Sequence, residues 1–304
     1  MTPSGPHPGT SPRDASVLVC TYRAETELEL VLAGLLRQSR APDEVLVADD
    51  GSGPETAVLV ARFAEAAPFP IIHVRHEDDG CRRSRIVNRA VATSRGEHLA
   101  FLDGDTVPHR DWLADHLRRA SGAVLCGRRV RLGPDYTPRF TRARLESGDF
   151  DGLPPSDLIA SALRGDTKRL GFGLRLPRAL QLLLHPRRDK KLMGCNFSLP
   201  RAAFVEVNGF DEAWAGSALL SDDWDLEVRL RKAGWRLEPL LRAGVTYHLH
   251  HPVRAYTPGE RELRAARAVE APLRAVAGLD AHLADLESAV AASSAREPAA
   301  TDAR

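Results

Sequence analysis

The sequence predicts an α/β fold in which helices flank a Rossmann-like, mostly parallel central sheet. Two observations support this prediction. Short apolar runs alternate with helical patterns through the first part of the chain, as they do in right-handed β-α-β units. Two of these runs end directly in acidic residues, at Asp49-Asp50 and at Asp103-Gly104-Asp105. Because parallel strands bring their carboxyl ends to one edge of a sheet, both acidic clusters are expected at the edge where such sheets bind ligands.

The order of the elements follows from the spacing of the apolar residues. A short continuous apolar run predicts a strand, and apolar residues three or four positions apart predict a helix. The first strands are expected at 16–21, 44–48, 71–74 and 99–102, with helices at 25–38, 54–66 and 82–94 between them. A helix at 112–120, a strand at 123–127, helices at 200–207 and 226–232, and a strand at 245–247 complete the expected elements.

Changes in composition divide the chain into one large domain with additions. Residues 1–15 and 293–304 are rich in small and polar residues and are expected to be disordered. An Ala-, Arg- and Leu-rich tract at 258–292 predicts a helical extension. The domain itself is expected at 16–257, with a first half at 16–130, a variable basic region at 131–190 and a last part at 191–257.

Composition restricts the class of protein. The 304 residues are 43% hydrophobic, enough to bury a full core, and the formal net charge of +1 gives no reason to expect a nucleic-acid partner. Four scattered cysteines without a C-x-x-C pair fit a reducing compartment and argue against a zinc knuckle. The sequence has no signal peptide of ordinary form and no apolar stretch of about 20 residues. A cytoplasmic protein is therefore expected.

A basic stretch at 164–191 has two interpretations. It holds nine Lys or Arg against two Asp, and leucines lie between the cations. One interpretation is a solvated amphipathic helix beside the core. The other is a surface for an anionic membrane or a lipid-pyrophosphate acceptor, which would place the protein peripherally at the inner face of the membrane.

The pair Asp103 and Asp105 is the strongest candidate for chemistry. Two carboxylates this close in sequence are costly to keep ionised unless a cation lies between them or both face water. Carboxylate oxygens suit Mg²⁺ or Mn²⁺, which would usually be shared with the phosphates of a nucleotide. A solvated turn is the alternative, because Asp-Gly is a common turn dipeptide.

Taken in order, the motifs resemble those of the glycosyltransferase family 2 enzymes, whose fold is called GT-A. The resemblance covers about residues 16–252. Its last part resembles the branch that shares its acceptor-side half with galactosyltransferases and chondroitin-type polymerases. The matching motifs are Ser16 to Tyr22, Val47 to Ser52, His76 to Gly80 with Arg85 and Asn88, Phe101 to Asp105, Gly194 to Ser198, Asn208 to Glu212, Asp222 to Asp225, and Tyr247-His248.

The resemblance implies a metal-dependent, inverting transfer of a sugar from a nucleotide sugar, with a UDP-sugar expected. The acceptor would be a saccharide or glycolipid in cell-surface glycan biosynthesis. Residues 16–130 would then form the nucleotide-sugar half. Asp105 would bind Mn²⁺ or Mg²⁺ directly, and Asp103 would face the ribose or reach the metal through water. His248 would complete the metal site, with His250 and His251 as rivals. In an extended segment, His250 would share the face of His248.

The same resemblance implies a pocket for the nucleotide. Asp50 would accept a hydrogen bond from the imide N–H of uracil, while Thr21 and Tyr22 would line the base pocket. Asp79 and Arg85 would approach the nucleotide from the third β-α unit. The alternatives are that Asp50 caps the following helix and that Arg85 is a surface cation.

Two further acids are implied in catalysis. Asp223 would take the proton of the acceptor hydroxyl as general base, and Asp222 would contact the acceptor or orient that base. The order here is Ser221-Asp222-Asp223, where the related galactosyltransferases carry Gly-Glu-Asp. The alternative is that these acids stabilise the N-terminus of the helix that follows them.

Other classes of protein fit the sequence less well. A sugar-phosphate nucleotidyltransferase would need a Gly-rich phosphate loop after the first strand, where this chain has Thr21-Tyr22-Arg23. A retaining glycosyltransferase of related fold is the main enzymatic alternative, although the metal motif of such enzymes usually ends in His. A non-catalytic scaffold that binds nucleotide sugars or glycans would be expected to lack Asp105 or Asp223, and both are present.

Overall fold

A computed structural model describes residues 14–118, 120, 122–177, 180, 191–214, 222–252 and 270–294. Its strands are β1 (Ala15–Thr21), β2 (Glu44–Asp49), β3 (Ile71–Arg75), β4 (His98–Asp103), β5 (Thr106–Pro108), β6 (Val124–Cys126), β7 (Arg128–Arg131), β8 (Asn196–Pro200), β9 (Leu237–Pro239) and β10 (Val245–His248). Its α-helices are α1 (Glu25–Leu36), α2 (Pro54–Ala66), α3 (Arg83–Thr93), α4 (Trp112–Arg118), α5 (Arg142–Glu146), α6 (Ser156–Leu163), α8 (Arg201–Glu206), α9 (Asp222–Lys232) and α11 (Leu279–Ser294).

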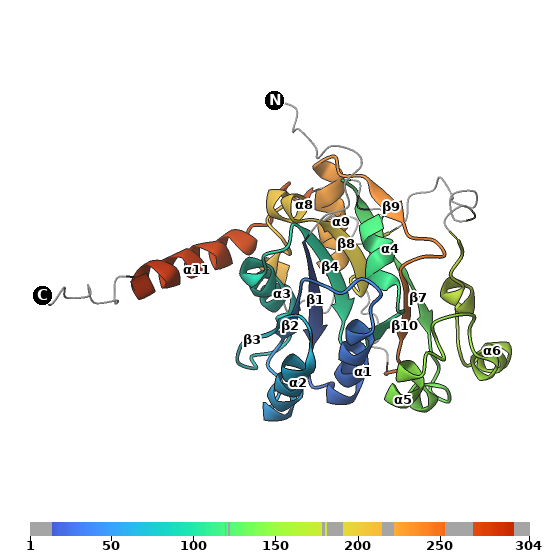
Figure 1. Cartoon of the computed structure of the whole chain (residues 1–304). Helices are drawn as coiled ribbons and strands as arrows, with labels where there is room; N and C mark the ends of the chain where they lie inside the picture. Colours follow the sequence, from blue (N-terminus) through green and yellow to red (C-terminus); the bar gives the residue numbers. More distant parts are fainter. Residues whose placement is uncertain are drawn as a thin grey trace, which may run out of the picture.

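The described strands form two sheets (Figure 1). The large sheet has seven strands in the order β3-β2-β1-β4-β8-β6-β9, and the small sheet has three in the order β5-β10-β7. β1 pairs in parallel with β2 and β4, and β2 pairs in parallel with β3. Of the described strands in the large sheet, only β8 runs antiparallel to its neighbours, so the prediction of a mostly parallel sheet is confirmed.

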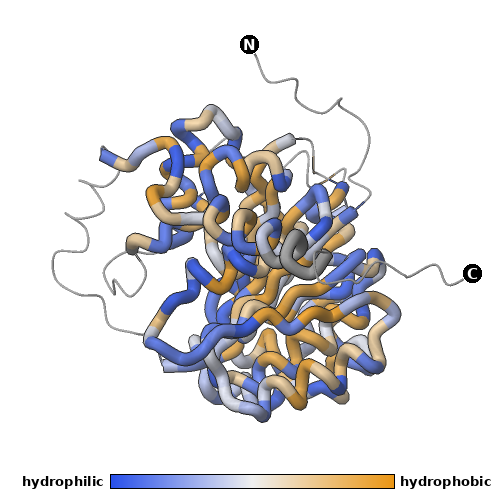
Figure 2. The backbone as a smooth tube through the Cα atoms, turned by 90° about the vertical axis from the view of Figure 1, so that its left-hand side faces the viewer, coloured by the Kyte–Doolittle hydropathy of each residue, from blue (hydrophilic) through white to orange (hydrophobic). Residues whose placement is uncertain are grey.

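The large sheet is buried on both faces. Along β1, Val17 and Val19 belong to the core on one face, which α1, α2 and α4 cover, and Leu18 belongs to the core on the other, which α3, α8 and α9 cover. Figure 2 shows the strands as hydrophobic runs in the interior. Burial on both faces explains why the sequence of these strands is continuously apolar instead of alternating.

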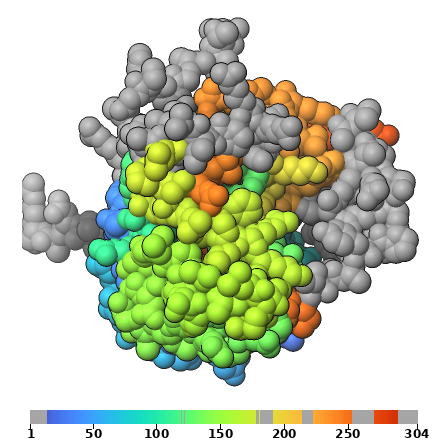
Figure 3. Space-filling model, turned by 90° about the vertical axis from the view of Figure 1, so that its right-hand side faces the viewer, coloured from blue at the N-terminus to red at the C-terminus, as the bar shows by residue number. Residues whose placement is uncertain are grey.

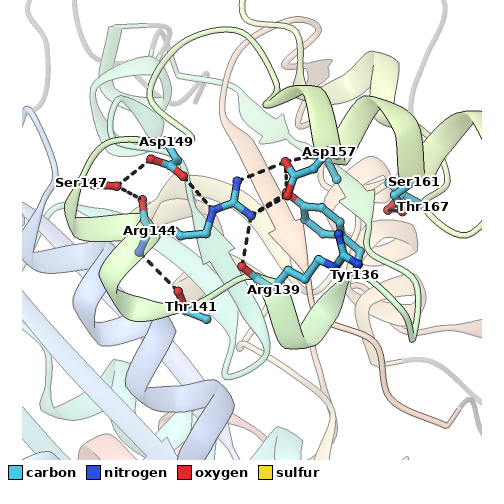
Figure 4. A network of polar contacts seen from close by, with 10 residues as sticks. Tyr136, Arg139, Thr141, Arg144, Ser147, Asp149, Asp157, Ser161 and Thr167 are labelled. Carbon is cyan, nitrogen blue, oxygen red and sulfur yellow. Dashed lines mark hydrogen bonds and ion pairs between the residues drawn. The ribbon is translucent and has the colours of Figure 1, made fainter.

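The region between β7 and β8 is held together by ion pairs on its own elements. Arg144 on α5 donates to Asp149 at 2.7 Å, to Asp157 at the start of α6 at 2.7 Å, and to the carbonyl of Arg139 (Figure 4). The hydroxyl of Tyr136 donates to the same Asp157. This region covers most of one face of the molecule, in green to yellow-green (Figure 3). Within the basic stretch predicted at 164–191, residues 178, 179 and 181–190 lie outside the described residues.

The C-terminal part differs from its prediction. A helical tract was expected over 258–292, but the described residues 271–278 are bends or irregular backbone, and α11 begins at Leu279. α11 contacts α3 and then extends away from the body (Figure 1). Residues 253–269 lie outside the described residues, as do 1–13 and 295–304, where disorder was predicted. Ala15, also within the predicted disordered end, begins β1.

Two further differences bear on the site. The helix predicted at 226–232 begins four residues earlier, so Asp222 and Asp223 lie in the first turn of α9. The short strands β5, β7, β8 and β9 were not predicted from the sequence. None of the described helices is long and apolar enough to cross a membrane.

Candidate functional site

Two adjoining hollows contain most of the residues that the sequence singled out. The first hollow, of about 500 Å³, opens at the carboxyl ends of β1 and β4. The second hollow, of about 380 Å³, lies between β4, the segment 191–195 and α9. Both are lined by Arg83, Asp103 and Arg129, which therefore form their shared wall. The predicted residues that line the first hollow are Thr21, Tyr22, Asp50, Asp103, Asp105 and His248, and those of the second are Asp222 and Asp223, with Asp103 shared.

The register of the parallel strands brings the first acids together. Thr21 pairs with Asp49 of β2, and its neighbour Cys20 pairs with Asp103 of β4. The residue between the two acids packs directly on β1, because the Gly104 N–H donates to the Cys20 carbonyl at 2.7 Å. A Cβ at Gly104 would lie 2.9 Å from the Thr21 hydroxyl oxygen, so no side chain fits there. This close approach is the physical reason for Asp-Gly-Asp at the end of β4.

Asp50, and not Asp49, faces the first hollow. The Asp49 side chain is fully buried, accepts from the Ser52 N–H at 2.8 Å and contacts the His73 ring at 2.9 Å. Burial raises the pKa of Asp49, but the hydrogen bonds of His73 and Ser52 outweigh it and lower the pKa overall. Asp50 accepts from the backbone N–H of Arg82 at 3.0 Å and contacts His76 Nε2 at 2.7 Å. These bonds fix the carboxylate at the wall of the hollow.

Thr21 and Tyr22 complete this side of the first hollow. The Thr21 hydroxyl is buried and has no hydrogen-bond partner among the described residues. The Tyr22 side chain is 45% exposed, and its hydroxyl donates to Asp78 at 3.1 Å. The hollow therefore offers an exposed aromatic ring, a free hydroxyl and the Asp50 carboxylate at one end.

Asp105 also lines the first hollow, beside two histidines. Its Oδ2 atom is 3.1 Å from His251 Nε2 and 3.7 Å from His248 Nε2, and one ligand atom from each residue lies within 4.8 Å of the others. Burial raises the pKa of Asp105, but the His251 hydrogen bond and the two imidazoles lower it overall. Burial lowers the pKa of His248 to about 4. An ionised carboxylate and a neutral imidazole are the forms that bind metal ions.

The expectation that His250 shares the face of His248 is wrong. β10 ends at His248, so the strand alternation does not continue, and His251 instead reaches Asp105. His250 is exposed, and its backbone N–H donates to the Thr137 hydroxyl at 2.9 Å. The sequence reasoning left His250 and His251 open as rivals of His248, and the structure places His248 and His251 beside Asp105.

The small sheet holds Asp105 and His248 in place. Asp105 directly precedes β5, and its carbonyl accepts from the Leu249 N–H at 3.0 Å. His248 pairs with Thr106 of β5 on one side and with Arg131 of β7 on the other. The acid and His248 are thus positioned by backbone hydrogen bonds of strands that are far apart in sequence.

Asn196 joins the small sheet to the large one. Its side-chain amide donates to the carbonyls of Arg128 and Gly244 at 2.9 Å, and its Oδ1 accepts from the Trp112 indole at 2.9 Å. A Cβ at Gly127 would lie 2.2 Å from the Asn196 side chain. The Gly194-Cys195-Asn196 motif therefore fixes the strands that carry the site.

Arg83 connects the two hollows. Its guanidinium donates to Asp103 at 2.9 Å and to Asp222 at 2.6 Å. The sequence reasoning chose Arg85, which is exposed and lines neither hollow. The helical periodicity could have excluded Arg85, because Arg85 and Arg89 lie on the exposed face of α3, away from the buried positions.

Asp79 is also outside the hollows. Its side chain is 79% exposed and pairs with Arg82 at 3.2 Å. The structure thus brings together eight of the ten predicted residues and leaves Asp79 and Arg85 at the surface. The residues that the sequence reasoning did not assign are Arg83, Arg129 and His251.

The second hollow contains a carboxyl group with an unusual pKa. Asp223 accepts from the Gly194 N–H at 2.9 Å. Burial and then the neighbouring Asp222 raise the pKa of Asp223 to about 6, against a smaller opposite effect of Arg83. The third acid of the motif, Asp225, is buried in an ion pair with Arg229 at 2.8 Å and belongs to the helix interior. Of the three acids of this motif, Asp222 and Asp223 therefore face the second hollow.

The fold and this acid-lined rim define a GT-A glycosyltransferase, and comparison with known proteins identifies the family. The family model described as glycosyl transferase family 2 matches residues 16–168. The chain belongs to this family.

Two curated relatives and two solved structures illustrate the match. The succinoglycan biosynthesis protein ExoM of Rhizobium meliloti (strain 1021) is 35% identical over 143 residues, which are 45% of this chain and 44% of ExoM. A validoxylamine A glucosyltransferase of Streptomyces hygroscopicus subsp. limoneus is 30% identical over 72% of this chain and 48% of its own. The chain spans about half the length of these relatives.

The structural matches support the fold. Staphylococcus aureus TarS 1–349 in complex with UDP superposes with a TM-score of 0.55 at 17% identity, over 90% of this chain and 70% of TarS. The mannosyltransferase PcManGT of Pyrobaculum calidifontis, in complex with GDP-Man and Mn²⁺, gives 0.53 at 17% identity, over 96% of this chain and 78% of its own. The chain is therefore a member of glycosyl transferase family 2 with a GT-A fold.

Proposed function

We propose that the protein is an inverting, metal-dependent glycosyltransferase that moves a sugar from a UDP-sugar to a saccharide or glycolipid acceptor. The observation that carries this proposal is the pair of adjoining hollows. One holds Asp50, Asp105 and His248, the other holds Asp223, and Asp103 lies in the wall between them. A donor in the first hollow and an acceptor in the second would meet at that wall.

The end of the first hollow at Asp50 suits a uracil base. A carboxylate offers about four lone-pair positions, and three are used by His76 and by two contacts of the Arg82 N–H. The remaining position can accept the imide N–H of uracil. The exposed ring of Tyr22 offers a stacking surface for the base, and the free Thr21 hydroxyl offers a further hydrogen bond. The complex of TarS with UDP is consistent with this assignment.

Asp105, His248 and His251 would hold the metal ion. One carboxylate and two imidazoles suit Mn²⁺ better than Mg²⁺, which prefers an all-oxygen shell. When bound, the ion supplies Lewis-acid stabilisation of the negative charge that develops on the leaving diphosphate. The complex of PcManGT with GDP-Man and Mn²⁺ is consistent with a metal ion in this fold.

Asp223 would act as the general base. The acceptor hydroxyl oxygen bonds to the anomeric carbon as the bond from that carbon to the phosphate oxygen breaks, and the hydroxyl proton passes to Asp223. One displacement of this kind inverts the anomeric centre. The raised pKa of Asp223, about 6, brings it near the operating pH, where a general base is most effective. Asp222, held by Arg83, would orient the acceptor.

A panel of nucleotide sugars tests the donor and the metal together. We expect one UDP-sugar with Mn²⁺ to raise the melting temperature, and EDTA or Asp105→Asn to reduce the shift. The panel includes GDP-mannose, because the nucleotide differs between the two structural matches. Stabilisation by GDP-mannose alone would replace UDP in the proposal, and no shift with any nucleotide would overturn the donor assignment. NMR of the product's anomeric proton separates inversion from retention.

We further propose a peripheral contact with an anionic membrane at the end of α6. Leu163 is 84% exposed and is followed by the exposed Arg164. An apolar side chain beside a cation is the combination that favours an anionic bilayer surface. In flotation with phosphatidylglycerol vesicles, Leu163→Asp should reduce binding, whereas Val58→Asp on α2, at a side chain 70% exposed, should not. Equal flotation of all three proteins would contradict the contact.

A further inference from the structure

The wall between the two hollows contains two arginines with different surroundings. Arg83 is bound by carboxylates on both sides, Asp103 at 2.9 Å and Asp222 at 2.6 Å. Arg129, on β7, lines the same two hollows. The Arg83 charge is therefore compensated by two of the protein's own acids, and Arg129 is the cation whose partners need to be explained.

No described carboxylate forms an ion pair with Arg129. Its guanidinium donates to the Cys195 sulfur at 2.9 Å, and its Nε atom is buried without a hydrogen-bond partner among the described residues. Burial raises the pKa of the Cys195 thiol to about 12, so this sulfur is neutral and does not compensate the charge. A partly buried cation with an unsatisfied donor is unfavourable unless a ligand supplies the missing acceptor.

The position of Arg129 indicates what kind of ligand this is. Thr246 of β10 pairs with Arg129 of β7, two residues before His248. Asp103 and Asp105 interact with the Arg129 charge through space. Burial lowers the pKa of His248 and Asp105 raises it, and Arg129 adds a smaller lowering effect. The guanidinium therefore lies between the proposed metal ligands and the second hollow. In a bound donor, the group between the metal and the anomeric carbon is the diphosphate.

We propose that Arg129 binds the diphosphate of the nucleotide donor and stabilises it as the leaving group. This inference rests on the proposed function. A guanidinium presents N–H groups in a planar fork that matches phosphate oxygens, and it keeps its protons at all physiological pH values. When the bond between the anomeric carbon and the phosphate oxygen breaks, the electron pair stays on that oxygen. Arg129 stabilises the resulting charge without transferring a proton.

The test separates the phosphates from the base. UDP and uridine are compared as ligands of the wild type, Arg129→Met and Arg129→Lys, by calorimetry for UDP and ligand-observed NMR for uridine. Hydrogen bonds to charged groups contribute about 1.5–3 kcal/mol, so Arg129→Met should weaken UDP binding about tenfold or more. Uridine binding should not change. The loss should persist in EDTA, which distinguishes Arg129 from the metal, and Arg129→Lys should restore part of it.

A neighbouring arginine supplies the matched control. Arg131 lies two residues further along β7 and lines neither hollow, so Arg131→Met makes the same change of charge on the same strand. Arg131 is half-buried and its charge acts on His248 through space, so we expect a loss of UDP affinity of about twofold, well below the loss in Arg129→Met. With the donor identified, Arg129→Met should lower kcat more than it raises KM.

The outcomes distinguish a failure of the proposed role of Arg129 from a failure of the proposed nucleotide donor. Equal loss of UDP and uridine binding in Arg129→Met, or an equal effect of Arg131→Met, would overturn the role of Arg129. Unchanged UDP affinity in Arg129→Met would do the same. A wild-type protein that binds no UDP with or without Mn²⁺ would instead contradict the proposed nucleotide.

Discussion

The two hollows differ in how their acids are held in place. The first hollow is built at the ends of adjacent parallel strands, and backbone pairing fixes Asp103 and Asp105 there. The second hollow is built by segments more than sixty residues further along the chain. Its acids are held through their side chains, Asp222 by Arg83 and Ser84, and Asp223 by the Gly194 N–H. The comparison indicates that backbone pairing makes the first hollow the more rigid half of the site, whereas the second hollow depends on the identity of a few side chains.

Asp223→Asn should separate the two halves most clearly. The amide cannot take a proton, so turnover should fall about 10³-fold, within the range for loss of a general base. UDP binding with Mn²⁺ should stay within a factor of about two, because Asp223 does not line the first hollow. Steady-state kinetics and calorimetry measure the two effects.

The stability of the same variant provides a control for folding. Because the pKa of Asp223 is raised on folding, its charged form is unfavourable in the folded state. This cost is absent below the unfolded value of about 3.9 and appears as pH rises through about 6. Asp223→Asn should therefore melt at or above the wild-type temperature at pH 8. Retained turnover would remove Asp223 from the role of base, and a lower melting temperature would show that the substitution disturbs the fold through the Gly194 contact.

His251→Ala should damage the first hollow. Loss of even an outer partner of a metal ligand costs about 10–100-fold in metal affinity, and removal of a direct ligand should cost at least as much. The Mn²⁺ concentration needed for half-maximal stabilisation by UDP measures this effect. His250→Ala is the matched control, since His250 is exposed and lines neither hollow. Equal effects of both substitutions would show that neither histidine is a specific ligand.

The pH profile gives the smallest expected effect. Protonation of Asp223 removes the base, so kcat should fall about tenfold for each unit below a pKa of about 6. Turnover is therefore lost as pH falls and is retained above pH 7. Arg83→Met should move this limb upward, since Arg83 lowers the Asp223 pKa. A profile without an acid limb would assign the proton to another group.

The sequence was sufficient where backbone periodicity decides the outcome. Thr21, Asp50 and Asp103 lie at the ends of strands that are continuous apolar runs joined by regular helices. The parallel pairing of these strands alone brings the three residues to one edge. Asp222 and Asp223 were also found, through the resemblance and not through a geometric argument. Their helix begins earlier than predicted because acids are favourable in a first turn.

The sequence was insufficient where single contacts decide the outcome. The sequence cannot distinguish the neighbouring arginines Arg82, Arg83 and Arg85. Only the tertiary fold brings Arg83 to Asp103 and Asp222. β7 and β8 are too short and too polar to be recognised, so Arg129 had no predicted strand. His250 was expected on the face of His248 because the end of β10 cannot be located from the sequence His248 to His251.

β10 has a further consequence through its side-chain alternation. Tyr247 is buried against Phe140 and Phe150, and the next residue, His248, reaches the rim. Inserting or deleting one residue in this strand would exchange the two faces, placing a phenol at the rim and an imidazole in the aromatic core. The number of residues in β10 thus decides which side chain reaches the rim. Any functional homologue must keep this number in the strand between β5 and β7, whatever the rest of its sequence.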